Sequence, residues 1–206
     1  MAYVMQAHLQ TEAYLKSVAE REKGFTYTTI REGLYAESCA MYTGFPTFTS
    51  PPDKVRIPHP GTGAGIAWVL IDDLGEATAR LVAQYAVPEP EGDVLGEYEN
   101  KIVLLSGKVA YGLAETVKVI GDAVGKEIEV EEVSVDEYAA DEIVQENLRG
   151  HGEGDVGRKW ATSFEAVERG ECEFTSKRLE RLLGREQEAF EAAVRRMVRE
   201  ARQKNG

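Results

Sequence analysis

The pattern of apolar and polar residues predicts a helix at the start of the chain and a strand directly after it. Residues 3–22 contain good helix formers and no Pro or Gly before Gly24, which suits the end of a helix. The apolar members of this segment form a rough stripe: Val4, Ala7, Tyr14, Leu15 and Val18. The next segment, 25–30, is dense in β-branched and aromatic residues, and it predicts a buried strand.

The rest of the chain continues this alternation of strands and helices. Further strands are predicted at 66–71, 101–106 and 127–133, and a short extended piece at 54–57. Further helices are predicted at 34–42, 73–86, 112–124, 134–148, 158–168, 177–183 and 186–204. Asp72 is expected to cap the helix at 73–86, and Ser134 with Glu137 forms a capping box for the helix at 134–148. This order of elements is typical of an α/β fold that ends in a helical region.

The composition fits one globular domain in a reducing compartment. The 206 residues are 43% apolar and 29% charged, which is enough apolar material for a sizeable core. No apolar run approaches the roughly 18 residues of a membrane span, and no signal segment follows Met1. Cys39 and Cys172 lie far apart and match no metal or redox spacing. We therefore expect a cytoplasmic protein with reduced thiols.

The net charge of −12 is distributed unevenly along the chain. Residues 1–70 carry six basic and six acidic side chains, residues 71–176 carry nine and twenty-five, and residues 177–206 carry nine and five. The middle segment, at −16, opposes binding to nucleic-acid phosphates. The basic C-terminal segment has no stacking aromatic residue beyond Phe190, so it is interpreted as the solvated face of a helix. We expect a small-molecule substrate, no nucleic acid and no membrane as partners.

The glycine-rich segment 61–65 (Gly-Thr-Gly-Ala-Gly) lies in the wrong context for a phosphate-binding loop. Such a loop needs a strand before it and a helix N-terminus after it, whereas here a proline-flanked loop precedes and a predicted strand follows. A mobile loop beside a pocket and a plain turn both remain open. Neither G-x-G-x-x-G nor G-x-x-x-x-G-K-[ST] occurs in the sequence, so the chain alone lacks the usual means of holding a dinucleotide.

The three histidines share no helical face and no ligand spacing, so no metal site is expected. His8 lies four residues before Glu12 on the predicted first helix, which is also the pattern of an ordinary surface pair. His59, between two prolines, could face a pocket or be exposed, and His151 in a glycine turn is expected to be solvated. No G-x-S-x-G elbow and no Cys–His arrangement supports a hydrolase.

Three stretches of sequence, taken together, resemble one family. They are 7–15 (Ala-His-Leu-Gln-Thr-Glu-Ala-Tyr-Leu), 27–35 (Tyr-Thr-Thr-Ile-Arg-Glu-Gly-Leu-Tyr) and 72–77 (Asp-Asp-Leu-Gly-Glu-Ala). The predicted strand at 102–106, the Leu-Leu-Gly-Arg of 182–185 and Phe190 also suit it. The chain resembles the NmrA-like group of atypical short-chain dehydrogenases, in the NAD(P)-binding Rossmann superfamily. The resemblance extends over essentially the whole chain and is strongest over 7–35 and 54–85.

The resemblance implies that part of the family's fold is missing. Members of this group begin with a Rossmann βαβ unit that carries the glycine-rich turn, before the helix that matches 3–17. The implied architecture is therefore an α/β, incomplete Rossmann-like fold that lacks the N-terminal dinucleotide-binding strands and has an α-rich C-terminal substrate-side region. We expect a single NmrA-like domain over 1–206, with a remnant of the Rossmann part and a pocket loop at 1–87 and the substrate-side α/β and helical region at 101–206.

The resemblance also implies site residues. His8 aligns with a helix position where the family often has a Lys that contacts the nicotinamide ribose. It departs from the Tyr-x-x-x-Lys pattern, because Tyr3 precedes it by five residues. The turn at 30–33 is implied to run beside the nicotinamide, with NADP or NAD as cofactor. The candidate cofactor-binding residues are His8, Ile30, Arg31 and Gly33. The candidate catalytic residues are His8, Tyr35 and His59.

Three functions remain open at this point. The first is a truncated NAD(P)-linked oxidoreductase or NADP(H)-responsive regulator whose cofactor phosphate-binding half is missing. The second is a cofactor-independent isomerase or cyclase of small-molecule metabolism that reuses the pocket, since histidine suits acid–base work near neutral pH. The third is a non-catalytic binding or regulatory module. A strand edge and a helix face left bare by the missing half predict self-association or docking to an N-terminal half.

Overall fold

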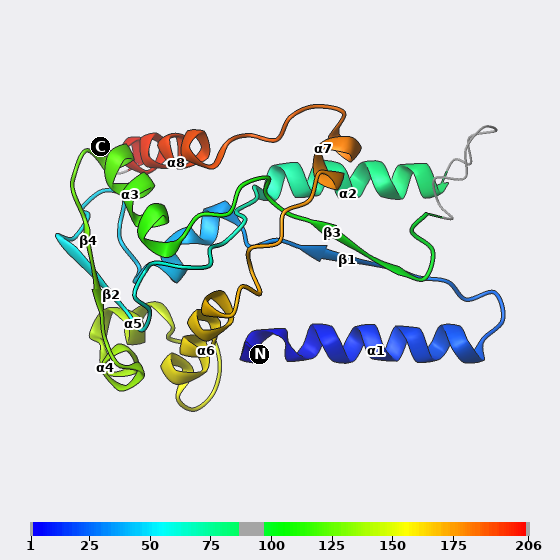
Figure 1. Cartoon of the computed structure of the whole chain (residues 1–206), viewed down its shortest axis with the longest axis horizontal. Coiled ribbons are helices and arrows are strands. Elements are labelled where there is room, and N and C mark those ends of the chain that lie inside the picture. Colours follow the sequence, from blue (N-terminus) through cyan, green and yellow to red (C-terminus); the bar gives the residue numbers. More distant parts are fainter. Residues whose placement is uncertain (1, 87–96, 205–206) are drawn as a thin grey trace.

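The computed structural model describes residues 2–86 and 97–204 (Figure 1). A short 3-10 helix η1 (Tyr3–Met5) leads into α1 (Gln6–Arg21), and a second one, η2 (Ala36–Tyr42), follows the first strand. The strands are β1 (Thr28–Glu32), β2 (Lys54–Ile57), β3 (Lys101–Leu105) and β4 (Glu129–Glu132). The remaining helices are α2 (Ile71–Ala86), α3 (Leu113–Val124), α4 (Val135–Ala140), α5 (Glu142–Asn147), α6 (Val156–Glu168), α7 (Arg178–Leu183) and α8 (Phe190–Lys204).

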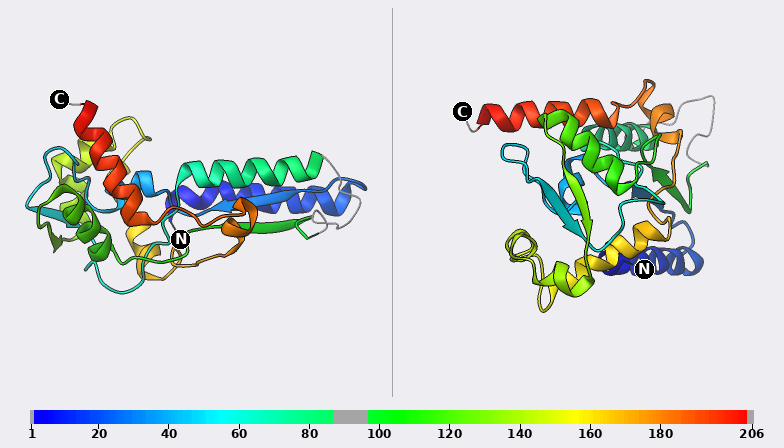
Figure 2. Two further views of the ribbon diagram at one scale, coloured as in Figure 1. Left: turned by 90° about the horizontal axis from the view of Figure 1, so that it is seen from above. Right: turned by 60° about the vertical axis from the view of Figure 1, so that its left-hand side comes forward.

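The strands of the described residues form two separate parallel pairs. β1 pairs with β3, from Thr28 opposite Lys101 to Glu32 opposite Leu105. β2 pairs with β4, from Lys54 opposite Glu129 to Ile57 opposite Glu132. Parallel neighbours need a crossover connection, and α2 lies on the path between β1 and β3. α1 and α2 lie on opposite faces of the β1–β3 pair, so this part of the molecule has the layers of a Rossmann-like α/β unit (Figures 1 and 2).

Two hydrophobic clusters hold the molecule together. The larger one joins η2, α3, α6 and α8, and Trp68 contacts several of its aromatic rings. The Trp68 ring stacks on Phe190 with centroids 5.6 Å apart and meets Tyr42 edge-on at 5.8 Å. The smaller cluster fills the space between the β1–β3 pair, α2 and α7. Burial of this apolar area is the main favourable contribution to folding.

α1 confirms the predicted first helix, but its apolar stripe is not buried. No residue of α1 is buried, and Tyr14 is 65% exposed. The helix is held at its start, where Ala2 is buried and the backbone N–H of Tyr3 donates to the Thr162 hydroxyl at 2.9 Å. It is held again at its middle by an ion pair between Glu12 and Arg31. Most of α1 therefore lies along the molecule without being enclosed by it (Figure 2).

Several predicted boundaries are wrong. The strand expected at 25–30 is observed as β1, three residues later, and it is only partly buried. The expected strand at 66–71 is absent. The segment is almost fully buried, but it forms only single bridges, between Ile66 and Tyr111 and between Val69 and Tyr35. Its backbone hydrogen bonds go to several different partners rather than to one neighbouring strand. The apolar composition of the segment therefore reflects its burial and not pairing in a sheet.

Two predicted helices also differ in detail. Asp72 does not cap α2, because the helix begins at Ile71, before Asp72 itself. The Glu37 carboxylate accepts the N–H of Ile71 instead. The helix expected at 134–148 is divided into α4 and α5, because Asp141 adopts an extended conformation and its side chain caps α5. The capping box of Ser134 and Glu137 is confirmed. The end of α3 at Gly125, with φ of 79°, is confirmed as well.

Candidate functional site

The carboxyl ends of β1 and β3 meet at one place in the fold. Gly33 follows β1, and its backbone N–H donates to the carbonyl of Leu105 at 2.7 Å. A Cβ on Gly33 would lie 3.1 Å from the backbone of Ser106, so the backbone segments that follow β1 and β3 approach closely. Ligands of open parallel sheets bind at the carboxyl ends of the strands. This edge is therefore the candidate site.

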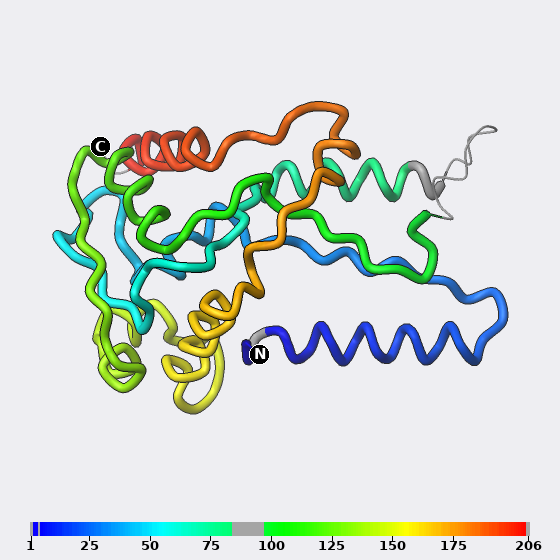
Figure 3. The backbone as a smooth tube through the Cα atoms, viewed as in Figure 1, coloured from blue at the N-terminus to red at the C-terminus, as the bar shows by residue number. Residues whose placement is uncertain are grey.

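The buried segment 66–70 borders the same edge. Val69 donates to the carbonyl of Leu34 at 3.1 Å and accepts from the N–H of Ala36 at 2.8 Å. Gly107, which follows β3, donates to the carbonyl of Ala67 at 3.2 Å. The connection between α6 and α7 reaches this segment too, where the N–H of Ala67 donates to the carbonyl of Cys172 (orange in Figure 3). Three distant parts of the sequence thus fix the position of one short segment.

Tyr35 lies at this edge and is hydrogen-bonded to a carboxylate. Its hydroxyl donates to Glu32 at 2.5 Å, and 37% of the residue is exposed. The hydrogen bond to Glu32 raises the pKa of the Tyr35 phenol, with burial adding to the effect. The phenol is therefore protonated near neutral pH, and the Glu32 carboxylate accepts its hydrogen bond.

Arg31 is engaged by α1. Its Nε donates to Glu12 Oε1 at 2.7 Å and its Nη2 to Glu12 Oε2 at 2.5 Å, a two-pronged geometry that suits guanidinium and carboxylate. The hydrogen bond to Arg31 lowers the pKa of Glu12. His8 lies one turn before Glu12 and is exposed. We name the Arg31–Glu12 pair the clasp, because it fixes the middle of α1, and with it His8, relative to β1.

Loosening the clasp is expected to free α1 without unfolding the chain. We expect Glu12→Gln to raise amide hydrogen exchange across α1 and to lower the free energy of unfolding by only about 1 kcal/mol, since the Arg31 side chain is partly exposed. Amide hydrogen exchange measures the opening of α1, and urea unfolding measures the free energy of unfolding. The control is Lys118→Ala, which removes an exposed pair with Asp122 and should change neither. Unchanged exchange in α1 of Glu12→Gln would contradict the role of the clasp.

His59 lies apart from the other candidate residues, because it follows β2 in the other strand pair. Only 2% of the residue is exposed. Its Nδ1 accepts the backbone N–H of Gly61 at 2.9 Å, and its Nε2 is buried without a hydrogen-bond partner among the described residues. Burial lowers the pKa of the imidazole. The structure brings His8, Arg31 and Tyr35 to the β1 side of the molecule and does not bring His59 there.

The other candidate cofactor-binding residues have structural contacts of their own. The Ile30 side chain is partly buried and packs against the smaller hydrophobic cluster. Gly33 packs closely against Ser106, whose hydroxyl is buried without a partner among the residues described. Glu32 and Ser106 were not singled out from the sequence. Glu32 lies within the turn at 30–33 that the resemblance indicated, so its place in that turn was the available signal.

The glycine-rich segment 61–65 packs against the start of α3. The carbonyl of Gly61 accepts the N–H of Ala114 at 2.8 Å, and a Cβ on Gly65 would lie 2.5 Å from the backbone of Tyr111. The Glu115 carboxylate accepts the N–H of Gly112 at 2.8 Å. The glycines therefore serve a close approach between backbones, and the donors at this helix start are already used.

The starts of three helices offer no open site for the phosphates of a dinucleotide. The N-termini of α2, α3 and α6 each receive a carboxylate of the chain itself: Glu37, Glu115 and Asp155. An anion at any of these positions would have to displace a resident negative charge. Over 2–86 and 97–204, no group of three or more His, Cys, Asp or Glu side chains is placed to hold a metal ion.

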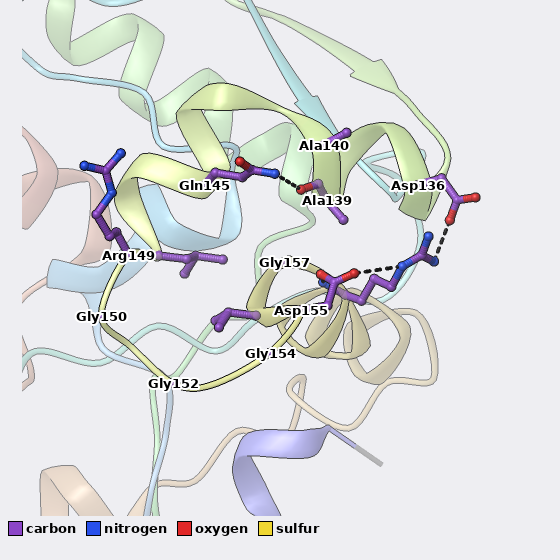
Figure 4. A pocket seen from close by; sticks show the side chains of 13 residues that line it. Asp136, Ala139, Ala140, Gln145, Arg149, Gly150, Gly152, Gly154, Asp155 and Gly157 are labelled. Carbon is purple, nitrogen blue, oxygen red and sulfur yellow. Dashed lines mark hydrogen bonds and ion pairs between the residues drawn. The ribbon is translucent and has the colours of Figure 1, made fainter.

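Two cavities lie away from the candidate residues. One, of about 480 Å³, lies between α4, α5, the glycine turn at 150–154 and the start of α6 (Figure 4). Arg158 closes one side of it through ion pairs with Asp136 and Asp155, whereas the Arg149 side chain extends away from it (Figure 4). The other, of about 330 Å³, lies between the loop after η2 and α5. Neither is lined by His8, Tyr35 or His59.

Known proteins similar to this chain support the resemblance to the NmrA-like family. No protein-family model matches the sequence. The NmrA-like family domain-containing oxidoreductase flvB of Aspergillus flavus is 32% identical over 200 residues, which are 97% of this chain and 57% of the relative. Over almost its whole length the chain is similar to an NmrA-like protein. It spans a little over half the length of this NmrA-like relative.

Solved structures agree with the NmrA-like fold. The NADPH-dependent quinone oxidoreductase QOR2 of Escherichia coli, complexed with NADPH, matches with a TM-score of 0.63 at 22% identity, over 92% of this chain and 58% of that chain. NmrA, a negative transcriptional regulator in complex with NADP, matches with a TM-score of 0.62 at 12% identity, over 96% of this chain and 59% of that chain. Across its described residues the chain thus has the α/β fold of these two structures. No helix in that part of the chain is long and apolar enough to cross a membrane.

Proposed function

We propose that the chain is the substrate-side part of an NmrA-like NAD(P)-linked oxidoreductase or NADP(H)-responsive regulator, and that a second polypeptide segment supplies the cofactor phosphate site. One observation carries this proposal: β1 has an open edge between two helices. No strand of the described residues other than β3 pairs with β1. α1 and α2 cover opposite faces of the pair (Figure 1).

The surroundings of this edge favour a further strand as its partner. Parallel sheets in α/β proteins are covered on both faces and rarely stop at two strands, because an isolated pair is only marginally stable. Here α1 has no buried residue, and Ile102 on β3 remains 45% exposed. A strand added beside β1 would pair its unbonded backbone groups and bury more of both helices.

The candidate side chains have suitable chemistry for the substrate side. Tyr35 offers a phenol proton with Glu32 behind it, and His8 offers an imidazole from α1. NADPH or NADP would supply hydride or a binding signal, as the names of the relatives indicate for those proteins. The carboxylates already bonded at the starts of α2 and α3 support the need for a second segment.

Titration with NADPH tests the proposal. The chain alone is expected to show no saturable binding. Co-expression with the part of the A. flavus relative that lies outside the match is expected to give a one-to-one complex that binds NADPH. Oxidation of NADPH by this complex with a carbonyl or quinone compound would indicate an oxidoreductase, and binding without oxidation a regulator.

Four results would contradict parts of the proposal. Tight NADPH binding by the chain alone would show that the chain holds the cofactor itself. A stable monomer that the added segment does not bind would refute the open edge. Self-association that blocks the added segment would identify a second copy as the occupant of the edge. Turnover without NADPH, lost in His8→Ala, would favour a cofactor-independent isomerase or cyclase.

A further inference from the structure

His59 closes a tight turn with its imidazole ring. It lies between Pro58 and Pro60 at the end of β2, and its Nδ1 accepts the N–H of Gly61, two residues later. This is the bond that an Asn or Asp side chain makes in an Asx turn. An acceptor nitrogen carries no proton, so the neutral ring must carry its proton on Nε2. That atom is buried and has no partner among the described residues.

The turn is connected to the candidate site through one continuous segment. The carbonyl of Gly61 accepts from Ala114 in the first turn of α3 at 2.8 Å. Ile66 and Tyr111 then exchange two backbone hydrogen bonds, of 2.8 and 3.0 Å. Directly afterwards, segment 66–70 bonds to the residues that follow β1 and β3. The position of the candidate site thus depends on a segment that His59 holds at its start.

The charged groups that act on the ring are acidic. Glu132 at the end of β4 and Glu168 at the end of α6 both favour the protonated imidazole, but burial outweighs them and lowers its pKa. The neutral ring therefore belongs to the native state near neutral pH. As the pH falls, proton uptake competes with the native arrangement, because a protonated Nδ1 can no longer accept from Gly61.

We propose that His59 is a proton-sensitive latch: protonation breaks the bond from Gly61 to Nδ1, releases segment 61–65 from the start of α3, and loosens segment 66–70 at the carboxyl ends of β1 and β3. The release itself depends only on the hydrogen bonds of this chain. The interpretation that this release regulates substrate binding rests on the proposed function.

The matched variant is His59→Asn. Asparagine places a carbonyl oxygen near the position of Nδ1 and keeps the turn, but it does not titrate. Amide protection factors, corrected for intrinsic exchange, are compared between about pH 7.5 and about pH 5.5, on either side of the ordinary histidine pKa of about 6.5. In the wild type, protection at Gly61, Ala114 and Ile66 is expected to fall by up to about tenfold at the lower pH, because local opening becomes easier. In His59→Asn it is expected to stay constant.

An internal reference separates the latch from general acid effects. The N–H of Glu137 donates to Ser134 at the start of α4, and no histidine takes part, so its protection should not change in either protein. An equal fall in His59→Asn, or no fall in the wild type, would overturn the latch. If His59→Asn does not fold, NMR titration of the wild type decides. The Gly61 amide shift must then move with the same midpoint as the His59 ring, and an independent midpoint overturns the proposal. None of these measurements uses NADPH, so the latch and the proposed function can fail separately.

Discussion

Gly107→Ala is expected to prevent stable folding. A Cβ at this position would lie 2.1 Å from the carbonyl oxygen of Trp68 and 2.9 Å from its carbonyl carbon. Both atoms belong to the backbone of the buried segment 66–70, so no side-chain rotation can relieve the overlap. Moving these two backbone segments apart would also break the hydrogen bond from the Gly107 N–H to the carbonyl of Ala67. We expect a loss of about 3 kcal/mol or more, a large fraction of the 5–15 kcal/mol that typically stabilises a domain.

The matched control for Gly107→Ala is Gly75→Ala. Gly75 lies inside α2, is exposed, and has nothing within 4 Å of a new Cβ. Alanine there should raise stability by about 0.5–1 kcal/mol through helix propensity. Urea unfolding followed by circular dichroism compares both variants with the wild type. A Gly107→Ala protein within about 1 kcal/mol of the wild type would refute the close approach.

Trp68→Ala is expected to have an effect of similar size by opening the larger hydrophobic cluster. The ring is buried against Phe190 and Tyr42, and its Nε1 donates to the Thr116 hydroxyl at 3.0 Å. Removing it creates a cavity at the point where η2, α3 and α8 meet, for which about 3–5 kcal/mol is the usual loss. The measurement is the free energy of unfolding from urea titration, with Trp160 left as the fluorescent reporter.

Two further variants sharpen this test. Trp68→Phe keeps most of the aromatic volume and removes the hydrogen bond, so it should lose less than Trp68→Ala. Phe174→Ala removes an aromatic ring that is 64% exposed, and it should change stability by no more than about 0.5 kcal/mol. Equal effects of Trp68→Ala and Phe174→Ala would show that the ring contacts of Trp68 do not stabilise the chain.

Local signals in the sequence predicted local structure well. Three predicted features depend only on residues within a few positions of one another, and all three are confirmed. They are the extended piece at 54–57, the helix that ends at Gly125 and the capping box at Ser134. Segment 66–70 was predicted wrongly because its apolar composition reports burial and not strand pairing. Its backbone partners lie at Leu34, Gly107, Tyr111 and Cys172, and no local pattern specifies them.

The candidate site was predictable only in part, for the same reason. The strand-end position of Tyr35 followed from the order of elements and the resemblance, but its bond to Glu32 depends on side-chain geometry. The i, i+4 spacing of His8 and Glu12 was visible, whereas the partner of Glu12 turned out to be Arg31 on the neighbouring strand. His59 was expected near a pocket, and its ring is buried and accepts a hydrogen bond from the N–H of Gly61 in its own loop.

The two strand pairs also govern how this chain can reach its fold. Around β1 and β3 the paired residues lie 73 positions apart, and around β2 and β4 they lie 75 apart. Neither pair can form as a hairpin, so each must wait until a long stretch of chain has closed. Chains dominated by such distant contacts fold slowly and expose unpaired strands while they do so. Helices such as α3 and α8 are therefore expected to form well before either sheet.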